Sequence, residues 1–320
     1  MKIGVFTVLF GQKPFQEALD YIQSKGVQAV EIGTGSYPGN AHCPLDELLG
    51  SESSRKAFVN AIESRGLTLD SLSCHGNPLH PDKAFAKAED DTFTKTIRLA
   101  SLLGVERVNT FSGCPGDSDA AARPNWVTCP WPPDFTEILD WQWSEKVIPY
   151  WTAKNAFLEE HNVKACLEMH PGFVVYNPET MLKLNKAAGK NVGANFDPSH
   201  FWWQGIDPVY AIRALGDIIY HFHAKDCKID EINTKTSGVL DTKPYGDEIH
   251  RSWVFRTVGY GHSEEAWRAI ISNLRMVGYD WVISIEHEDS IMSVNEGFER
   301  AVEFLKPIVF QESPGDMWWA

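Results

Sequence analysis

The sequence predicts a single (β/α)8 barrel, and three observations support this fold class. Short runs rich in β-branched residues alternate with longer amphipathic stretches along the whole 320-residue chain. Several predicted helices stop at a glycine directly before the next such run, as helix-to-strand connections in α/β proteins do. Four strand-like segments in the second half end in a potential metal ligand. Functional groups at the carboxyl ends of successive parallel strands are typical of this barrel.

The predicted elements continue from end to end without a change in composition. We expect strands at residues 2–9, 27–32, 67–74, 105–110, 163–168, 192–197, 218–223 and 281–286. We expect helices at residues 14–24, 53–65, 91–103, 143–160, 178–188, 208–215, 263–276 and 292–305.

Two connections are long, one after the fourth strand (113–140, with little helical periodicity) and one after the seventh (224–261). Loops of this length in a compact domain usually carry function or are ordered by their own packing. We therefore expect one barrel domain over residues 1–310 and a tail over 311–320. The tail contains Trp318 and Trp319, which we expect to dock on this chain or on a neighbour.

Composition and charge exclude several classes of protein. Apolar residues make up 43% and charged residues 22% of the chain, which indicates a globular protein. The formal charge is -14, from 29 basic and 43 acidic residues, and it disfavours binding to nucleic acid or anionic lipid. No stretch approaches the roughly 20 apolar residues that span a bilayer. The amino terminus lacks a cleavage site and the six cysteines show no CxxC pairing, so we expect a cytoplasmic protein.

The four ligand-bearing strand ends predict a metal site. The residues are Glu168, Asp197, His223 and Glu286. A single glutamate at a strand end is usually a solvated loop residue, but four such residues at consecutive strand ends are hard to explain by chance. Three carboxylates and one imidazole suit one hard or borderline divalent cation that keeps open positions for a substrate. We therefore expect a metal-dependent enzyme that acts on a small polyol or sugar.

Three short motifs, together with Glu168, resemble a known family. The motifs are Asp197-Pro-Ser-His200, His223-Ala-Lys-Asp226, and the run from Gly278-Tyr-Asp to Ile-Glu286. Through them nearly the whole chain resembles the xylose-isomerase-like barrel superfamily. Its members include sugar isomerases and epimerases, inosose dehydratases and family-two apurinic endonucleases.

This resemblance implies roles for particular residues. Glu168, Asp197, His223 and Glu286 would hold one divalent cation, Mn²⁺ in first place, with Mg²⁺, Co²⁺ or Zn²⁺ as alternatives. Glu168 and Glu286 would also exchange protons with substrate carbon on opposite faces. The substrate oxygens would be bound by His200 and Arg256.

The chemistry expected of such a site is enolisation. A cation bound to a carbonyl oxygen and an adjacent hydroxyl oxygen stabilises the enediolate formed when the neighbouring C–H bond loses its proton. Carboxylates serve as the bases, and a positioned base typically contributes about 10²- to 10⁴-fold. Two bases on opposite faces allow inversion at carbon, whereas one base that shuttles its proton gives an aldose–ketose shift. We therefore expect a sugar isomerase or epimerase.

Three further residues are expected near the substrate. His75 follows the third strand, and we expect it to contact substrate or to transfer a proton; the alternative is a histidine hydrogen-bonded into its loop. Glu31 ends the second predicted strand and could reach a sugar hydroxyl, with an ion pair as the alternative. His170 lies two residues beyond Glu168, on the same face of the strand.

Tryptophans are abundant, 12 in all, and several fall in the predicted top loops. Trp126, Trp131 and Trp202 could stack on sugar rings or bury an apolar ligand. It is equally plausible that they pack the long loops or a subunit interface. If they line the site, the substrate is a glycoside, a disaccharide or an aryl-bearing sugar. No cluster of lysine and arginine marks the top loops, which favours a neutral sugar over a sugar phosphate.

Other activities remain open from the sequence. A lyase would abstract the C2 proton of a 3-keto-glycoside and expel the substituent at C1. C-glycoside deglycosidase large subunits and 3-keto-glycoside lyases resemble this superfamily too. Val174 favours them, because many ketose 3-epimerases carry a glutamate there. An inosose-type dehydratase is a third variant.

A nuclease is disfavoured. The resemblance implies that a nuclease of this superfamily needs a trinuclear zinc site, with further histidines on the fourth strand and in the loop after the seventh. This sequence has Asn109-Thr-Phe-Ser112 and Arg256-Thr-Val258 at those two positions, without a histidine. A non-catalytic barrel would leave the four ligands unexplained. We expect the partner to be a small-molecule sugar or glycoside and the protein to be a homo-oligomer. A small partner subunit is expected if it is a deglycosidase.

Overall fold

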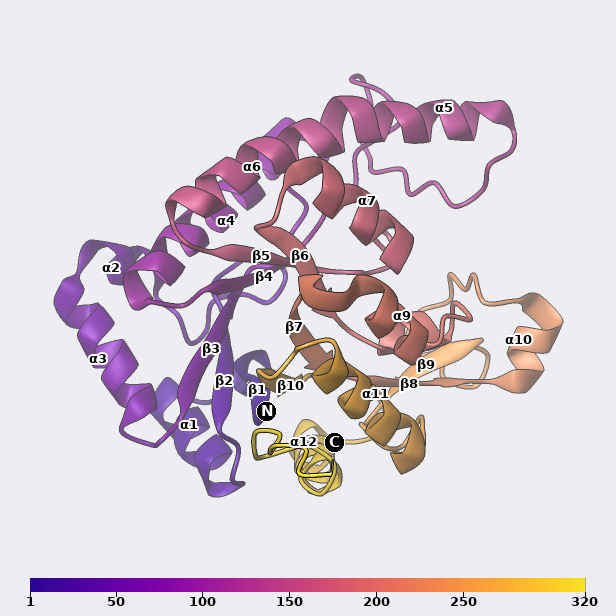
Figure 1. The fold of residues 1–320 in the computed structure, drawn as a ribbon. Helices are drawn as coiled ribbons and strands as arrows, with labels where there is room; N and C mark the ends of the chain where they lie inside the picture. Colours follow the sequence, from indigo (N-terminus) through magenta and orange to yellow (C-terminus); the bar gives the residue numbers. More distant parts are fainter. Residues whose placement is uncertain (320) are drawn as a thin grey trace.

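The computed structural model describes residues 1–319 and shows a closed barrel (Figure 1). Eight parallel strands pair in the ring order β1-β10-β7-β6-β5-β4-β3-β2, so the predicted (β/α)8 fold is confirmed. The strands are β1 Lys2–Phe6, β2 Ala29–Gly33, β3 Thr68–Ser73, β4 Arg107–Phe111, β5 Lys164–Glu168, β6 Val192–Phe196, β7 Ile219–Ala224 and β10 Val282–Ile285. Because all run in one direction, their carboxyl ends meet at one mouth of the barrel.

Helices surround this ring and bury its outer face. They are α1 Phe15–Ser24, α3 Glu52–Glu63, α4 Lys83–Leu103, α6 Ile148–Glu160, α7 Pro178–Ala188, α9 Pro208–Leu215, α11 Glu264–Met276 and α12 Val294–Leu305. The apolar core fills the layer between strands and helices, where residues such as Val30, Leu72 and Ile270 are buried. Local signals set the helix ends: the Asn177 side chain accepts from the Thr180 amide in a capping box, and Gly104 closes α4 with a left-handed φ of 70°.

Several predicted boundaries were wrong. The first strand ends at Phe6, and Thr7–Phe10 form a 3-10 turn in place of its last residues. Helix α4 begins at Lys83, well before residue 91, because the Asp82 side chain caps the amides of Ala84 and Phe85. A short helix, α2 at Leu45–Gly50, lies in the connection after β2 and was not predicted.

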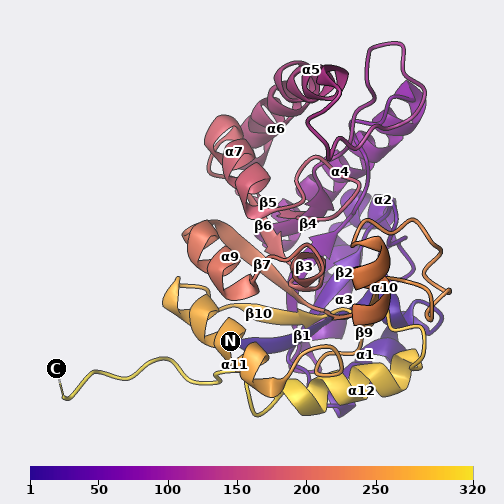
Figure 2. The same cartoon turned by 90° about the vertical axis from the view of Figure 1, so that its right-hand side faces the viewer.

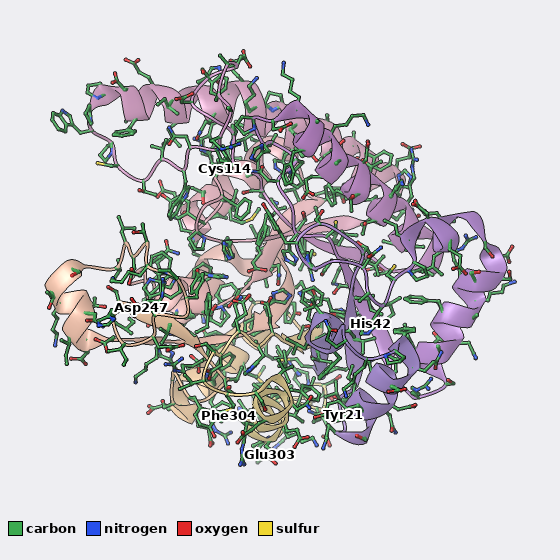
Figure 3. The ribbon with its side chains drawn as sticks, turned by 180° about the vertical axis from the view of Figure 1, so that it is seen from behind. Tyr21, His42, Cys114, Asp247, Glu303 and Phe304 are labelled. Carbon is green, nitrogen blue, oxygen red and sulfur yellow. The ribbon has the colours of Figure 1, made fainter. Side chains whose placement is uncertain are left out.

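The long connection after β4 is partly helical, contrary to the expectation of little helical periodicity up to residue 140. Helix α5, Pro133–Trp141, continues through a π-helical turn, Gln142–Val147, into α6. The buried Gln142 amide donates to three carbonyls of the preceding loop, at Pro115, Gly116 and Asn125. The loop is therefore tied to the helix that follows it. Cys114, labelled in Figure 3, lies at the start of this connection.

The connection after β7 folds into an excursion of its own. Strands β8, Asp226–Ile229, and β9, Trp253–Arg256, pair antiparallel, and α10, Glu231–Ser237, lies between them in the chain. Asp247, labelled in Figure 3, belongs to this excursion. In Figures 1 and 3 the excursion and α5 project on the same side of the barrel. The long loops after strands four and seven thus both have regular structure.

The carboxyl-terminal segment leaves the barrel as an extended tail (Figure 2). Trp318 is 89% exposed and Trp319 is 68% exposed, so neither docks on this chain. Docking on a neighbouring molecule stays a prediction, and Ala320 lies outside the described residues. Within residues 1–319, no helix has both the length and the apolar character that crossing a bilayer requires.

Candidate active site

The four predicted ligands come together at the mouth of the barrel. One donor atom from each of Glu168, Asp197, His223 and Glu286 can be chosen so that all four lie within 4.8 Å of one another. Glu168 is the last residue of β5, Asp197 and Glu286 directly follow β6 and β10, and His223 lies in β7. Glu168, Asp197 and His223 are buried, and Glu286 is half-buried. Neighbouring strands therefore aim these side chains at one point.

Glu168 is held by imidazoles from three directions. Its Oε1 lies 3.0 Å from His200 Nε2, and its Oε2 lies 3.0 Å from His75 Nε2 and 3.2 Å from His223 Nδ1. Burial alone would raise the pKa of Glu168, but the hydrogen bonds from His200, His223 and His75 outweigh burial and hold that pKa well below its usual range. The carboxylate is thus kept ionised and able to accept a proton.

A buried lysine links two of the other carboxylates. Lys225 Nζ lies 3.1 Å from Asp197 Oδ2 and 3.0 Å from Glu286 Oε2. Burial opposes its charge, but Asp197 and Glu286 keep the pKa of Lys225 well above its usual value. Burial also raises the pKa of Glu286, yet Lys225 and His223 lower it to about 2. For Asp197, burial and the nearby Glu168 and Glu286 carboxylates prevail over Lys225 and raise the pKa to about 6.

Lys225 was not among the predicted site residues. It stands inside the quoted motif His223-Ala-Lys-Asp226, two residues after a predicted ligand. This spacing places its side chain on the same side of the strand as His223. That periodicity is the sequence signal that could have identified it.

His223 presents its two ring nitrogens to different layers of the barrel. Nδ1 lies 3.2 Å from Glu168 and 3.1 Å from Glu286, at the mouth. Nε2 lies 3.1 and 3.0 Å from the two oxygens of Glu31, deeper in the barrel. Burial lowers the pKa of His223, but Glu31 and Glu286 raise it well above its usual value.

Glu31 is therefore not at the substrate pocket, and its expected contact with a sugar hydroxyl is not supported. It lies in the middle of β2, is fully buried, and accepts hydrogen bonds from Ser73, Asn109 and Ser284. The structure instead shows the alternative expectation, an ion pair, which Glu31 forms with His223. A carboxylate behind a metal-ligating histidine fixes the ring tautomer and orientation. This contact leaves Nδ1 of His223 facing the cluster.

A pocket of about 460 Å³ opens above the cluster. Its polar lining residues are His75, Glu168, His170, Lys225, Glu286 and Glu288. Its apolar lining residues are Phe6, Val8, Tyr37, Pro38, Phe111 and Phe173, and the two sets meet where Phe111 packs on His75 and His170. Phe111 and Phe173 stack with ring centroids 4.2 Å apart. The volume lies within the range of small-molecule sites.

The structure brings the predicted histidines to this pocket or directly behind it. His75 and His170 line it, and His200 lies behind Glu168, with its ring 4.2 Å from that of His170. Burial lowers the pKa of His170 to about 4, and burial together with Lys225 lowers the pKa of His200. Both imidazoles are therefore neutral near pH 7. His170, which lines the pocket, can exchange hydrogen bonds with an uncharged ligand.

Arg256 and the predicted tryptophans do not line this pocket. The Arg256 guanidinium pairs with Glu248 at 2.6 Å and with Asp289 at 3.4 Å, so the structure does not support its expected contact with substrate. Trp126 packs on Tyr176 within the loops, and Trp131 is 72% exposed. The Trp202 ring stacks on His262 at 3.7 Å, beside a different hollow near α9 and α11. The aromatic surface at the pocket comes from phenylalanine and tyrosine instead.

Comparison with known proteins agrees with this geometry. Residues 19–308 match the family described as the xylose isomerase-like TIM barrel. The chain belongs to that family. The resemblance inferred from the motifs is thus confirmed, and the family and its solved neighbours include sugar epimerases and isomerases.

Three similar proteins illustrate the range of the family. The chain is 40% identical over 314 residues to an uncharacterised protein of Bacillus subtilis (strain 168), YfiH, a match that covers 97% of this chain and all of YfiH. A solved IolI protein with a bound zinc atom has a TM-score of 0.64 at 18% identity, covering 97% and 98% of the two chains. A D-psicose 3-epimerase solved in the presence of D-fructose has a TM-score of 0.61 at 14% identity, covering 97% and 99%.

The donor set fits a divalent cation. Three carboxylates and one imidazole nitrogen, which would give up its proton to the ion, give oxygen-rich coordination with one borderline donor, which suits Mn²⁺, Mg²⁺, Co²⁺ or Zn²⁺. Glu31 supplies the partner behind the imidazole that such histidines normally have. Glu168 and Glu286 also face the pocket, so the same groups could hold an ion and meet a substrate.

Proposed function

We propose that this protein is a divalent-metal-dependent sugar isomerase or epimerase. The observation that carries the proposal is the position of two glutamates, Glu168 and Glu286, which belong both to the four-residue cluster and to the wall of the pocket. Such carboxylates can bind a cation and accept a proton from a substrate held beside it. The epimerase and the zinc-bound IolI protein that share the fold support the proposal.

The reaction follows from the chain's own groups. When bound, a divalent cation would polarise the substrate carbonyl and make the neighbouring C–H bond more acidic. Glu168 or Glu286 accepts that proton, and the electron pair of the C–H bond moves toward the carbonyl oxygen. Return of the proton to the former carbonyl carbon, with transfer of the neighbouring hydroxyl proton to the former carbonyl oxygen, gives the isomer. Delivery of a proton to the opposite face of the original carbon by the other glutamate, which must then start in its protonated form, gives the epimer.

The electrostatics of the site keep Glu168 ionised at neutral pH. His75, His200 and His223 keep the pKa of Glu168 low despite burial, so the carboxylate is ionised before substrate binds. Apolar rings among the lining residues limit the water that reaches it. A desolvated, oriented carboxylate needs little reorganisation when it takes the proton.

The pocket favours an unphosphorylated substrate. Among its lining residues Lys225 is the one lysine or arginine, and three carboxylates surround it. Arg256, the other nearby cation, is paired with Glu248 and Asp289. A phosphate group would therefore find no free cationic partner on this wall. A neutral polyol can use the carboxylates and imidazoles as acceptors and donors.

The second candidate is a lyase that acts on 3-keto-glycosides. The apolar lining residues favour it, because Phe6, Phe111 and Phe173 could hold the substituent released from C1. Proton abstraction at C2 would use the same glutamates, and the C1 substituent would leave with its bonding electrons. Val174, which is buried, also fits this reaction better than a free-ketose epimerase.

One experiment tests the proposal and separates the two candidates. The Mn²⁺-loaded protein is mixed with free sugars and with 3-keto-glycosides in deuterated water, and NMR follows exchange at C2 and C3. An isomerase or epimerase gives exchange with an isomeric product, whereas a lyase releases the aglycone. Glu168→Gln and Glu286→Gln should each abolish exchange while the circular dichroism spectrum stays unchanged. Full turnover by either variant would reject the assignment of acid and base.

A further inference from the structure

Lys225 occupies a position that is unusual for a lysine. It lies between the end of β7 and the start of β8, and it is only 2% exposed although it lines the pocket. Because β7 ends at Ala224 and β8 begins at Asp226, the backbone of Lys225 is held on both sides. Its side chain therefore has little freedom to turn toward solvent. A buried ammonium group requires partners, because its transfer from water is otherwise very unfavourable.

The partners are three carboxylates and one aromatic ring. Lys225 Nζ lies 3.0 Å from Glu286, 3.1 Å from Asp197 and 3.4 Å from Glu288. The ring of Phe255 lies 4.9 Å away on another side. An ammonium group has three N–H donors, so each can face one of these carboxylates. Two of the three carboxylates are also proposed to hold the metal.

The excess of carboxylates makes this place suitable for a cation. Glu168, Asp197, Glu286 and Glu288 bring four negative charges, which Lys225 and His223 face when no ion is bound. A divalent ion would offset two of them, and Lys225 offsets a third. The lysine and the ion draw on the same carboxylates of Asp197 and Glu286. Each positive charge should therefore weaken the binding of the other.

We propose that Lys225 is a catalytic residue of this site, a fixed ammonium group that contacts a substrate oxygen and stabilises the negative charge that develops on it when a glutamate removes the proton. The inference rests on the proposed function. Lys225 lines the pocket together with Glu286 and Glu288, so a substrate oxygen can replace one carboxylate contact of Nζ. The same ammonium group weakens metal binding, because it pairs with two of the carboxylates that would hold the ion.

The consequence is that removing the charge should move two quantities in opposite directions. Lys225→Met keeps the length and the apolar stem of the side chain but removes the ammonium group. We expect Mn²⁺ to bind at least tenfold more tightly, about 1.4 kcal/mol. We expect kcat for substrate proton exchange to fall by roughly 10²-fold or more, as when an oxyanion donor is removed. A lysine that only paired with these carboxylates would give the tighter Mn²⁺ binding without the loss of proton exchange.

The measurements are Mn²⁺ titration by calorimetry and exchange of the substrate proton by NMR, each on full-length protein. Lys228→Met is the matched control, because Lys228 is an exposed lysine three residues further along, in strand β8. This control should keep both wild-type values. Lys225→Arg keeps the charge in a bulkier group, so it should keep Mn²⁺ affinity within about threefold while exchange still falls.

The outcomes separate this inference from the proposed function. A wild-type protein that binds no Mn²⁺ would reject the proposed function itself. A folded Lys225→Met variant with unchanged or weaker Mn²⁺ affinity would overturn the competition between the two cations. Wild-type exchange in that variant would overturn the catalytic role. If Lys225→Met does not fold, Lys225→Gln, which keeps two donors without the charge, undergoes the same measurements with the same expected results.

Discussion

Glu31 offers a sharp test of how the site is organised. Its carboxylate contacts His223 Nε2 at 3.0 and 3.1 Å from a layer below the pocket. The Glu31 carboxylate also accepts hydrogen bonds from the side chains of Ser73, Asn109 and Ser284, so these neighbours all act as donors. Glu31→Gln would place an amide N–H₂ among these donors and remove the negative charge that orients the imidazole.

The size of the effect follows from these contacts. Loss of a partner behind a metal-ligating histidine typically weakens metal binding by about 10- to 100-fold, or roughly 1.4 to 2.8 kcal/mol. A mispaired buried donor should also destabilise the fold by about 1–3 kcal/mol. We therefore expect a lower melting temperature and a Kd for Mn²⁺ raised by at least tenfold. Calorimetric titration with Mn²⁺ and thermal unfolding measure the two quantities.

The matched control for this prediction is Asp70→Asn. Asp70 is also a buried carboxylate bound to a histidine, His221, at 2.7 Å, and no contact joins it to the four-residue cluster. The control should lose stability but keep its affinity for Mn²⁺. If Glu31→Gln keeps wild-type Mn²⁺ affinity and instead raises KM for substrate, Glu31 binds substrate and the account of its position is refuted.

Three further predictions concern residues outside the metal cluster. Native protein should react with a thiol reagent at one cysteine, the exposed Cys129, since burial raises the pKa of thiols such as Cys74 to about 12; rapid labelling of several thiols would contradict this. Phe111→Ala should raise KM about three- to tenfold, while Trp131→Ala should leave it unchanged, because Phe111 lines the pocket and Trp131 is 72% exposed. Ending the chain after Ser313 should shift the melting temperature by less than about 2 °C, because the side chains of residues 314–319 are exposed; a larger loss would show that the tail docks.

The cluster of four ligands could be predicted from the sequence for a geometric reason. Parallel strands that close a barrel bring their carboxyl ends to one mouth, so Glu168, Asp197, His223 and Glu286 had to lie near one another once the strands were identified. Strand positions followed from β-branched runs and glycine stops, which are local signals. The ranges were therefore right to within a few residues for most strands.

The depth of each residue in the barrel could not be predicted in this way. Glu31 lies in the middle of β2 and contacts the ring nitrogen of His223 that faces away from the cluster, one layer below the mouth. A lysine is normally solvated, so Lys225 became a site residue only when the fold showed three carboxylates around it. Tryptophan suits sugar stacking and loop packing equally, and the choice depends on distant contacts such as that of Trp202 with His262.

The most direct test of the central claim is the stoichiometry of metal binding. Calorimetric titration of the metal-free protein with Mn²⁺, checked by elemental analysis after dialysis, should give one ion per chain. Asp197→Ala and His223→Ala should each lose that ion while the protein remains folded. Failure of the wild-type protein to bind Mn²⁺, Mg²⁺, Co²⁺ or Zn²⁺, or unchanged metal content in both variants, would contradict the account.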